Sequence, residues 1–139
     1  MGASIKRHSI LIVDDESSVL KALQRLLRDE DYSIRTASSY EEAMEWLERQ
    51  PFAVVMSDYM MPGVSGDELL GMVKKKYPST VRVMLSGAAY AKSPNPAITE
   101  GTLHCQIFIA KPWNDDKLIE TIRNSVISYE SADRGRTGV

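Results

Sequence analysis

Polar side chains with reactive or ligand-binding groups follow four short apolar stretches of the chain. Carboxylates follow the first two of these stretches, a hydroxyl follows the next and an amino group follows the last. Carboxylates brought together repel one another unless a cation joins them, and oxygen ligands select a hard cation such as Mg²⁺. A nearby ammonium and hydroxyl could hold a phosphoryl group, and a carboxylate nucleophile forms an acyl phosphate. The residues are Asp14 and Asp15, then Asp58, then Ser86, then Lys111.

Asp58 is the best candidate for the nucleophile. It stands apart from the Asp14-Asp15 pair and follows the strongly apolar run 52–56. Taken singly, each of these residues has a simpler explanation, because acids collect at helix N-termini and polar residues fill turns. Their joint occurrence at the ends of successive apolar runs favours a functional site over these explanations.

The elements that must position these residues alternate along the sequence. Apolar runs rich in β-branched residues predict strands, and the segments between them carry apolar residues three and four apart, which predicts amphipathic helices. Five strands alternating with helices predict a parallel sheet covered by helices on both faces. All strands of such a sheet end at the same edge, so the polar residues should meet there. The strands are predicted at 10–13, 32–37, 52–56, 81–85 and 107–110.

Two stretches break this alternation. A helix is expected after residue 87, but Pro94 and Pro96 fall within it, and proline removes a backbone donor and clashes inside a helix. We therefore expect a short or irregular fourth helix, mostly loop. The end of the chain, 131–139, has no apolar periodicity and is expected to be a linker or a frayed end. The predicted organisation is one domain at 8–128 and a tail or linker at 129–139.

Composition narrows the function classes. Lys and Arg number 17 and Asp and Glu 19, a net charge of −2, which argues against direct nucleic-acid binding. A single cysteine excludes an intrachain disulfide and any multi-cysteine metal site. No apolar run approaches the ~20 residues of a membrane span, and no signal-peptide pattern opens the chain. We expect a cytoplasmic protein without a membrane partner.

Four motifs resemble the receiver domain of two-component response regulators, over about residues 8–128. The most specific motif has Met and Pro three and four residues after an aspartate and Gly at eight. The motifs are Val13-Asp14-Asp15-Glu16, the run 58–66 with Asp58, Met61, Pro62 and Gly66, Leu85-Ser86-Gly87, and Lys111-Pro112-Trp113. The resemblance implies a flavodoxin-like, doubly wound, five-stranded fold. It also implies a cis peptide between Lys111 and Pro112.

The resemblance implies a role for each matching residue. Asp58 corresponds to the phosphoacceptor, Ser86 and Lys111 to residues that contact the phosphoryl group, and Phe108 to the switch aromatic. Asp15 is expected to ligate Mg²⁺ directly, Asp14 through water and Met60 through its backbone carbonyl. These implied site residues are Asp14, Asp15, Asp58, Met60, Ser86, Phe108 and Lys111.

The resemblance also implies partners. The phosphoryl donor would be a sensor histidine kinase or a phosphotransfer protein, and the receiver would act on an output domain or effector protein. A homodimer is a further assembly open to this family. Such a chain is a regulator that assists its own phosphorylation and dephosphorylation, and it is not an enzyme acting on a separate substrate.

Three other function classes compete with this hypothesis. A metal-dependent phosphatase with an aspartate nucleophile generally needs a second acid two residues later, where this chain has Met60. A flavodoxin-like cofactor-binding protein needs a phosphate-binding loop after the first strand, where this chain has acids. A receiver-like protein-interaction module not regulated by phosphorylation stays open as the alternative, although the complete set of acidic, Ser and Lys residues argues against it.

Overall fold

A computed structural model describes residues 8–87 and 103–137 of the chain. Within this part, one parallel sheet has the strand order β2-β1-β3-β4-β5. This is the flavodoxin-like order, in which the chain winds outward from β1 in both directions, so the predicted doubly wound fold is confirmed. The strands are β1 (His8–Val13), β2 (Tyr32–Ala37), β3 (Val54–Ser57), β4 (Val81–Gly87) and β5 (Ile107–Lys111).

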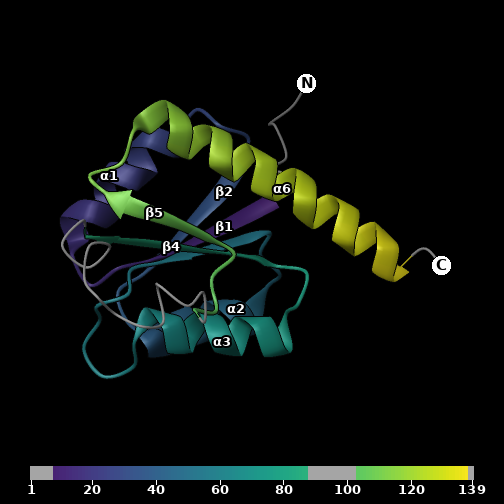
Figure 1. Cartoon of the computed structure of the whole chain (residues 1–139), viewed down its shortest axis with the longest axis horizontal. Helices are drawn as coiled ribbons and strands as arrows, with labels where there is room; N and C mark the ends of the chain where they lie inside the picture. The colour runs from purple at the N-terminus through teal and green to yellow at the C-terminus, as the bar shows by residue number, and fades with distance from the viewer. Residues whose placement is uncertain (1–7, 88–102, 138–139) are drawn as a thin grey trace.

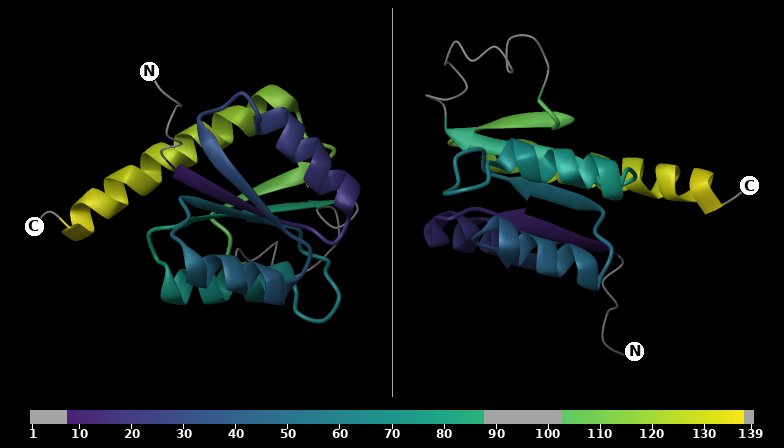
Figure 2. Two further views of the ribbon diagram at one scale, coloured as in Figure 1. Left: turned by 180° about the vertical axis from the view of Figure 1, so that it is seen from behind. Right: turned by 90° about the horizontal axis from the view of Figure 1, so that it is seen from below.

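Helices cover both faces of the sheet. Helices α1 and α6 pack on one face, and α2 and α3 pack on the other (Figures 1 and 2). The described helices are α1 (Ser17–Leu27), α2 (Tyr40–Arg49), α3 (Gly66–Lys76) and α6 (Asp115–Thr137). None of them is long and apolar enough to cross a membrane.

The central strand β1 shows how the sheet divides the core. Ile10 and Ile12 pack into the cluster under α1 and α6, whereas Leu11 and Val13 pack into the cluster under α2 and α3. All four are buried, because successive side chains of a strand point to opposite faces and here both faces are covered. A strand with apolar residues at every position is therefore what this central place in the sheet requires.

Helices α2 and α3 each begin after a serine that caps the helix. The Ser39 and Ser65 hydroxyls accept hydrogen bonds from the backbone N–H groups of Glu42 and Glu68, at 3.2 and 3.1 Å. At α2, the Glu42 carboxylate in turn accepts hydrogen bonds from the backbone N–H and the hydroxyl of Ser38, the residue before the cap. Both caps satisfy N–H groups that have no partner inside the helix.

The last helix extends into the segment expected to be a linker or a frayed end. Helix α6 runs through Thr137, and its last turns project beyond the sheet (Figure 1), so residues 131–137 are helical. Extending an existing helix costs little compared with nucleating one, and residues 131–137 contain no proline. The segment expected to hold a short or irregular fourth helix, with Pro94 and Pro96, lies outside the described residues.

Candidate functional site

Backbone pairing between strands fixes the two buried carboxylates at one edge of the sheet. Asp14 directly follows β1 and donates its backbone N–H to the carbonyl of Ala37 at 3.1 Å. Asp58 directly follows β3 and donates its N–H to the carbonyl of Val13 at 2.9 Å. Both residues therefore continue the pairing of the parallel sheet for one position, and their side chains leave the sheet at its carboxyl edge.

Lys111 brings a positive charge to these carboxylates from the far end of β5. Its Nζ donates a hydrogen bond to Oδ2 of Asp14 at 2.8 Å and lies 3.6 Å from Oδ1 of Asp58. The carboxylates of Asp14 and Asp58 are almost fully buried, and the Lys111 side chain is only 17% exposed. The ammonium thus lies between two carboxylates in a site with little water to screen them.

Burial raises the pKa of the Asp58 carboxyl above its ordinary value. The charge of Lys111 acts against this, while the charge of Asp14 adds to it. Hydrogen bonds from the Ser86 hydroxyl and the Tyr59 backbone N–H also lower the pKa of Asp58, without cancelling the rise. The site is therefore short of positive charge, because one ammonium serves two buried acids.

The pKa of Lys111 is also raised, which in a lysine favours the charged form. Burial alone would lower it, but the hydrogen bond to Asp14 and the charges of Asp14, Asp58 and Glu16 raise it above the ordinary value of lysine. Lys111 therefore stays protonated and acts as a fixed cation, not as a proton carrier.

The third acid completes a set of oxygen ligands. One carboxylate oxygen each from Asp14, Asp15 and Asp58 lie within 4.8 Å of one another. Asp15 is exposed, whereas the other two are buried, so the group opens to solvent on one side. Three carboxylates and an open side fit a hard divalent cation such as Mg²⁺, which takes few protein carboxylates and keeps several waters.

The remaining predicted residues lie on β4, on β5 and in the loop after β3. Ser86 lies near the end of β4, is fully buried and hydrogen-bonds the Asp58 carboxyl. Met60 lies in the loop after β3 with its side chain 63% exposed. Phe108 lies on β5 opposite Met84, three residues before Lys111, and packs partly buried against the α2–α3 cluster. The Lys111–Pro112 peptide is cis, which confirms the prediction.

A glycine at the start of α3 lies against the backbone of Asp58. A Cβ atom on Gly66 would fall 1.9 Å from the Asp58 carbonyl oxygen, closer than any real contact. Gly66 also donates its N–H to the carbonyl of Tyr59 at 2.9 Å. The glycine eight residues after Asp58 is therefore required by a close approach of helix and strand end.

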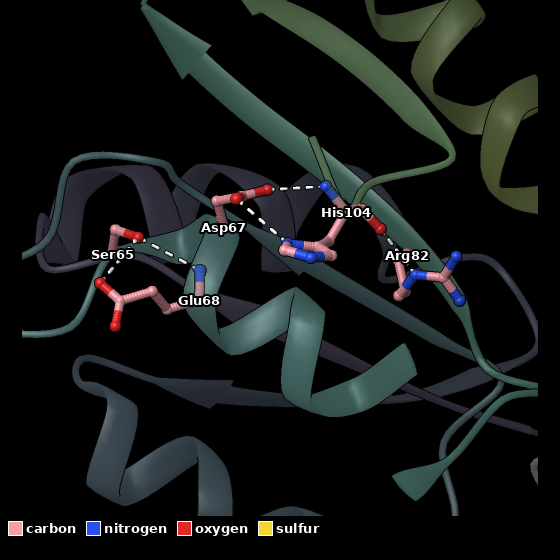
Figure 3. A network of polar contacts seen from close by, with 5 residues as sticks. All are labelled: Ser65, Asp67, Glu68, Arg82 and His104. Atoms are coloured by element: carbon pink, nitrogen blue, oxygen red, sulfur yellow. Dashed lines mark hydrogen bonds and ion pairs between the residues drawn. The ribbon is translucent and has the colours of Figure 1, made fainter. Parts of the chain in front are cut away.

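Sequence reasoning missed the network that fixes the entry to β5 (Figure 3). The Asp67 carboxylate, in the first turn of α3, accepts a hydrogen bond from the backbone N–H of His104 at 2.7 Å and contacts its Nδ1 at 3.1 Å. Arg82 on β4 donates from Nε to the His104 carbonyl at 2.7 Å. These contacts join α3 and β4 to the segment that leads into β5, so they help to set where Lys111 lies. A helix-start acid and a histidine 37 positions later give no periodic signal in the sequence.

The comparison with protein families decides to which family the chain belongs. Residues 10–123 match the model of the response regulator receiver domain. The chain belongs to this family. The receiver is 38% identical over 123 residues to the hydrogenase transcriptional regulatory protein HoxA of Cupriavidus necator, covering 88% of this chain and 25% of HoxA. The chain thus spans about a quarter of the length of that curated relative.

Solved structures of receivers are similar across nearly the whole chain. The signal receiver domain of an HD domain-containing protein from Pseudomonas fluorescens matches with a TM-score of 0.80 and 27% identity, covering 96% of this chain and 97% of that one. The response regulator TrrA of Thermotoga maritima, solved in complex with Mg²⁺-BeF, matches with a TM-score of 0.73 and 29% identity, covering 85% and 98%. The chain is therefore a receiver domain of two-component signal transduction, and its acidic group occupies the carboxyl edge of the family's fold.

Proposed function

We propose that this receiver accepts a phosphoryl group on Asp58 and changes its partner-binding surface as a result. The observation that carries the proposal is the convergence of Asp14, Asp15 and Asp58 within 4.8 Å, with the Lys111 ammonium 3.6 Å from Asp58. Asp58 follows β3, which lies between β1 and β4 in the sheet, and its carboxyl has both the Lys111 ammonium at 3.6 Å and a hydrogen bond from the Ser86 hydroxyl. It is thus the acid whose surroundings are suited to hold an added phosphoryl group.

The chain's own residues account for the transfer. An Oδ atom of Asp58 attacks the phosphorus of a phosphohistidine, and the bond between phosphorus and the imidazole nitrogen breaks. The electron pair of that bond stays on the nitrogen, which then takes up a proton. In the resulting acyl phosphate, Lys111 neutralises negative charge on the phosphoryl oxygens, and the Ser86 hydroxyl donates a hydrogen bond to them.

Asp15 would hold Mg²⁺ directly, Asp14 through water, and Asp58 and the backbone carbonyl of Met60 would complete its protein ligands. When bound, the cation supplies the positive charge that the site lacks and lowers the repulsion between carboxylates and phosphoryl oxygens. The raised pKa of Asp58 supports this assignment, because burial and the charge of Asp14 together outweigh the charge of Lys111.

The proposal extends to partners and place of action. The phosphoryl donor is a sensor histidine kinase or a phosphotransfer protein, and the protein acts in the cytoplasm as a regulator and not as an enzyme with a separate substrate. The region around Phe108 and β5 is the surface that changes. Residues 129–139 form a C-terminal tail or linker after the receiver at 8–128. The receiver acts on an output domain or effector protein, and a second copy of the chain is a further partner.

The test is phosphorylation by a small donor. Incubation with Mg²⁺ and acetyl phosphate should add the mass of one phosphoryl group to the intact protein. Asp58→Asn should abolish the addition, and the matched control Asp31→Asn, an exposed acid before β2, should not. Equal labelling of wild type and Asp58→Asn would refute the assignment.

A second measurement separates the switch from its alternative. Backbone amide resonances of β5 should shift when beryllofluoride is added to wild type and should stay in place in Asp58→Asn. Labelling at Asp58 without any shift in β5 would favour an interaction module that phosphorylation does not regulate.

A further inference from the structure

Ser57, the residue before the proposed phosphoacceptor, has a buried hydroxyl whose role is not yet explained. It ends β3, is fully buried and donates from Oγ to the carbonyl oxygen of Asp58 at 3.0 Å. Its side chain lies on the α3 side of the sheet, because a Cβ on Gly66 would come 3.0 Å from Ser57 Oγ. The hydroxyl therefore holds the Asp58 carbonyl from the face opposite α1 and α6.

The other end of the same peptide unit points at the site. The backbone N–H of Tyr59 hydrogen-bonds the Asp58 carboxyl, and this N–H belongs to the peptide whose carbonyl Ser57 holds. The C=O and N–H of a planar trans peptide point in opposite directions. A bond that fixes the carbonyl on one side therefore fixes the direction of the N–H on the other side.

Few other groups can hold this carbonyl. The α-carbon of Gly66 packs against it so closely that a Cβ would lie 1.9 Å from the oxygen. This close packing shields the carbonyl from water. Among the described residues, the Ser57 hydroxyl is the side-chain donor that hydrogen-bonds the carbonyl. Loss of the hydroxyl would leave a shielded acceptor without its donor, which favours rotation of the peptide.

We propose that Ser57 is a positioning residue for phosphoryl transfer, which aims the Tyr59 N–H at the Asp58 carboxylate and then at the phosphoryl group. The proposal rests on Asp58 being the phosphoacceptor. Ser57 itself touches neither the donor nor the transferred group. Its effect should therefore appear in the rate of transfer at saturating donor and in the state of the Tyr59 amide.

The experiment compares Ser57→Ala with Ser125→Ala. Ser125 is the matched control, because it is also buried and its Oγ donates to a carbonyl, that of Thr121 at 2.7 Å, within α6. Urea unfolding checks that both variants fold. Ser57→Cys, of nearly the same volume but a weak donor, replaces the alanine variant if that one does not fold.

Two readouts decide the outcome. With saturating Mg²⁺ and acetyl phosphate, Ser57→Ala should be phosphorylated about fivefold more slowly than wild type, as expected for the loss of one neutral hydrogen bond. In the unphosphorylated variant, the Tyr59 amide hydrogen should exchange with deuterium faster than in wild type. The NMR resonance of that amide should also shift. Ser125→Ala should match wild type in both, and Mg²⁺ affinity should be equal in all three.

Three results would overturn the role of Ser57. These are an unchanged Tyr59 amide in Ser57→Ala, an unchanged rate, or an equal loss of rate in Ser125→Ala, which would indicate a general effect on stability. Failure of the proposed function looks different, because wild type itself would not be labelled at Asp58. The Tyr59 amide of the unphosphorylated protein would then still report whether Ser57 orients the peptide.

Discussion

The ammonium of Lys111 lies 2.8 Å from Oδ2 of Asp14, although the two residues are 97 positions apart and two strands lie between them in the sheet. Asp14 follows β1 and Lys111 ends β5, with β3 and β4 in between. To reach Asp14, the lysine side chain passes the end of β3, where Asp58 lies 3.6 Å from Nζ. One ion pair therefore spans the site and sets the charge next to Asp58.

Replacing this lysine should expose the repulsion that it balances. In Lys111→Met, the buried Asp14 and Asp58 lose their cation, so the free energy of unfolding should fall by about 1–3 kcal/mol. Saturating Mg²⁺ should recover part of the loss, because a bound cation replaces the missing charge. Urea unfolding with and without Mg²⁺ measures this, with the exposed Lys21→Met as control. An identical loss in both conditions would contradict the charge argument.

Because the pKa of Asp58 is raised in the folded protein, the ionised form of Asp58 lowers the stability of the native state. A carboxyl whose pKa is higher in the folded than in the unfolded protein contributes stability below the unfolded value, near 3.8, and this is lost as the pH rises through the folded value. Without Mg²⁺, Asp58→Asn should therefore be more stable than wild type at neutral pH. The difference should shrink as the pH falls through the folded value and should be absent below 3.8. Thermal unfolding across pH in EDTA tests this, and a less stable asparagine variant at pH 7 would refute it.

Asp15, the exposed acid of the cluster, should affect the affinity for Mg²⁺ more than the stability of the fold. Asp15→Ala should weaken Mg²⁺ binding at least about tenfold, because a directly coordinating carboxylate is lost, while stability without Mg²⁺ changes little. Asp29→Ala, an exposed acid between α1 and β2, is the control. Calorimetric titration with Mg²⁺ gives both affinities. Equal affinities in the two variants would remove Asp15 from the ligands.

The close approach at Gly66 predicts a severe substitution. In Gly66→Ala, the new methyl would overlap the Asp58 carbonyl, so α3 or the strand end must move, at about 3 kcal/mol or more of stability. Gly63→Ala is the comparison, because its Cβ would meet nothing within 4 Å and only its positive φ of 81° is unfavourable, at about 1–2 kcal/mol. Urea unfolding ranks the two, and a milder effect at Gly66 would contradict the packing argument.

Local patterns determined the elements of this protein. Apolar runs predicted four of the strands and the weaker candidate 32–37 matches β2, because strand burial depends on residues close in sequence. Ser39 and Ser65 cap α2 and α3 in the same local way. Residues 131–137 were expected to be a linker or a frayed end because they lack apolar periodicity, and the structure continues α6 through them. A helix that is already nucleated extends at little cost.

The candidate site, too, was determined partly by the sequence and partly by the tertiary structure. The sequence alone determined which residues reach the carboxyl edge, because a polar residue that follows a buried parallel strand has no other place to go. Only the tertiary structure decided that Lys111 pairs with Asp14 and also faces Asp58, that Gly66 closes on the Asp58 carbonyl, and that Asp67 binds His104. Each of these contacts joins segments that are distant in sequence, or depends on how closely a helix approaches a strand. Their distances are set by strand order, sheet twist and packing, which no local pattern of residues encodes.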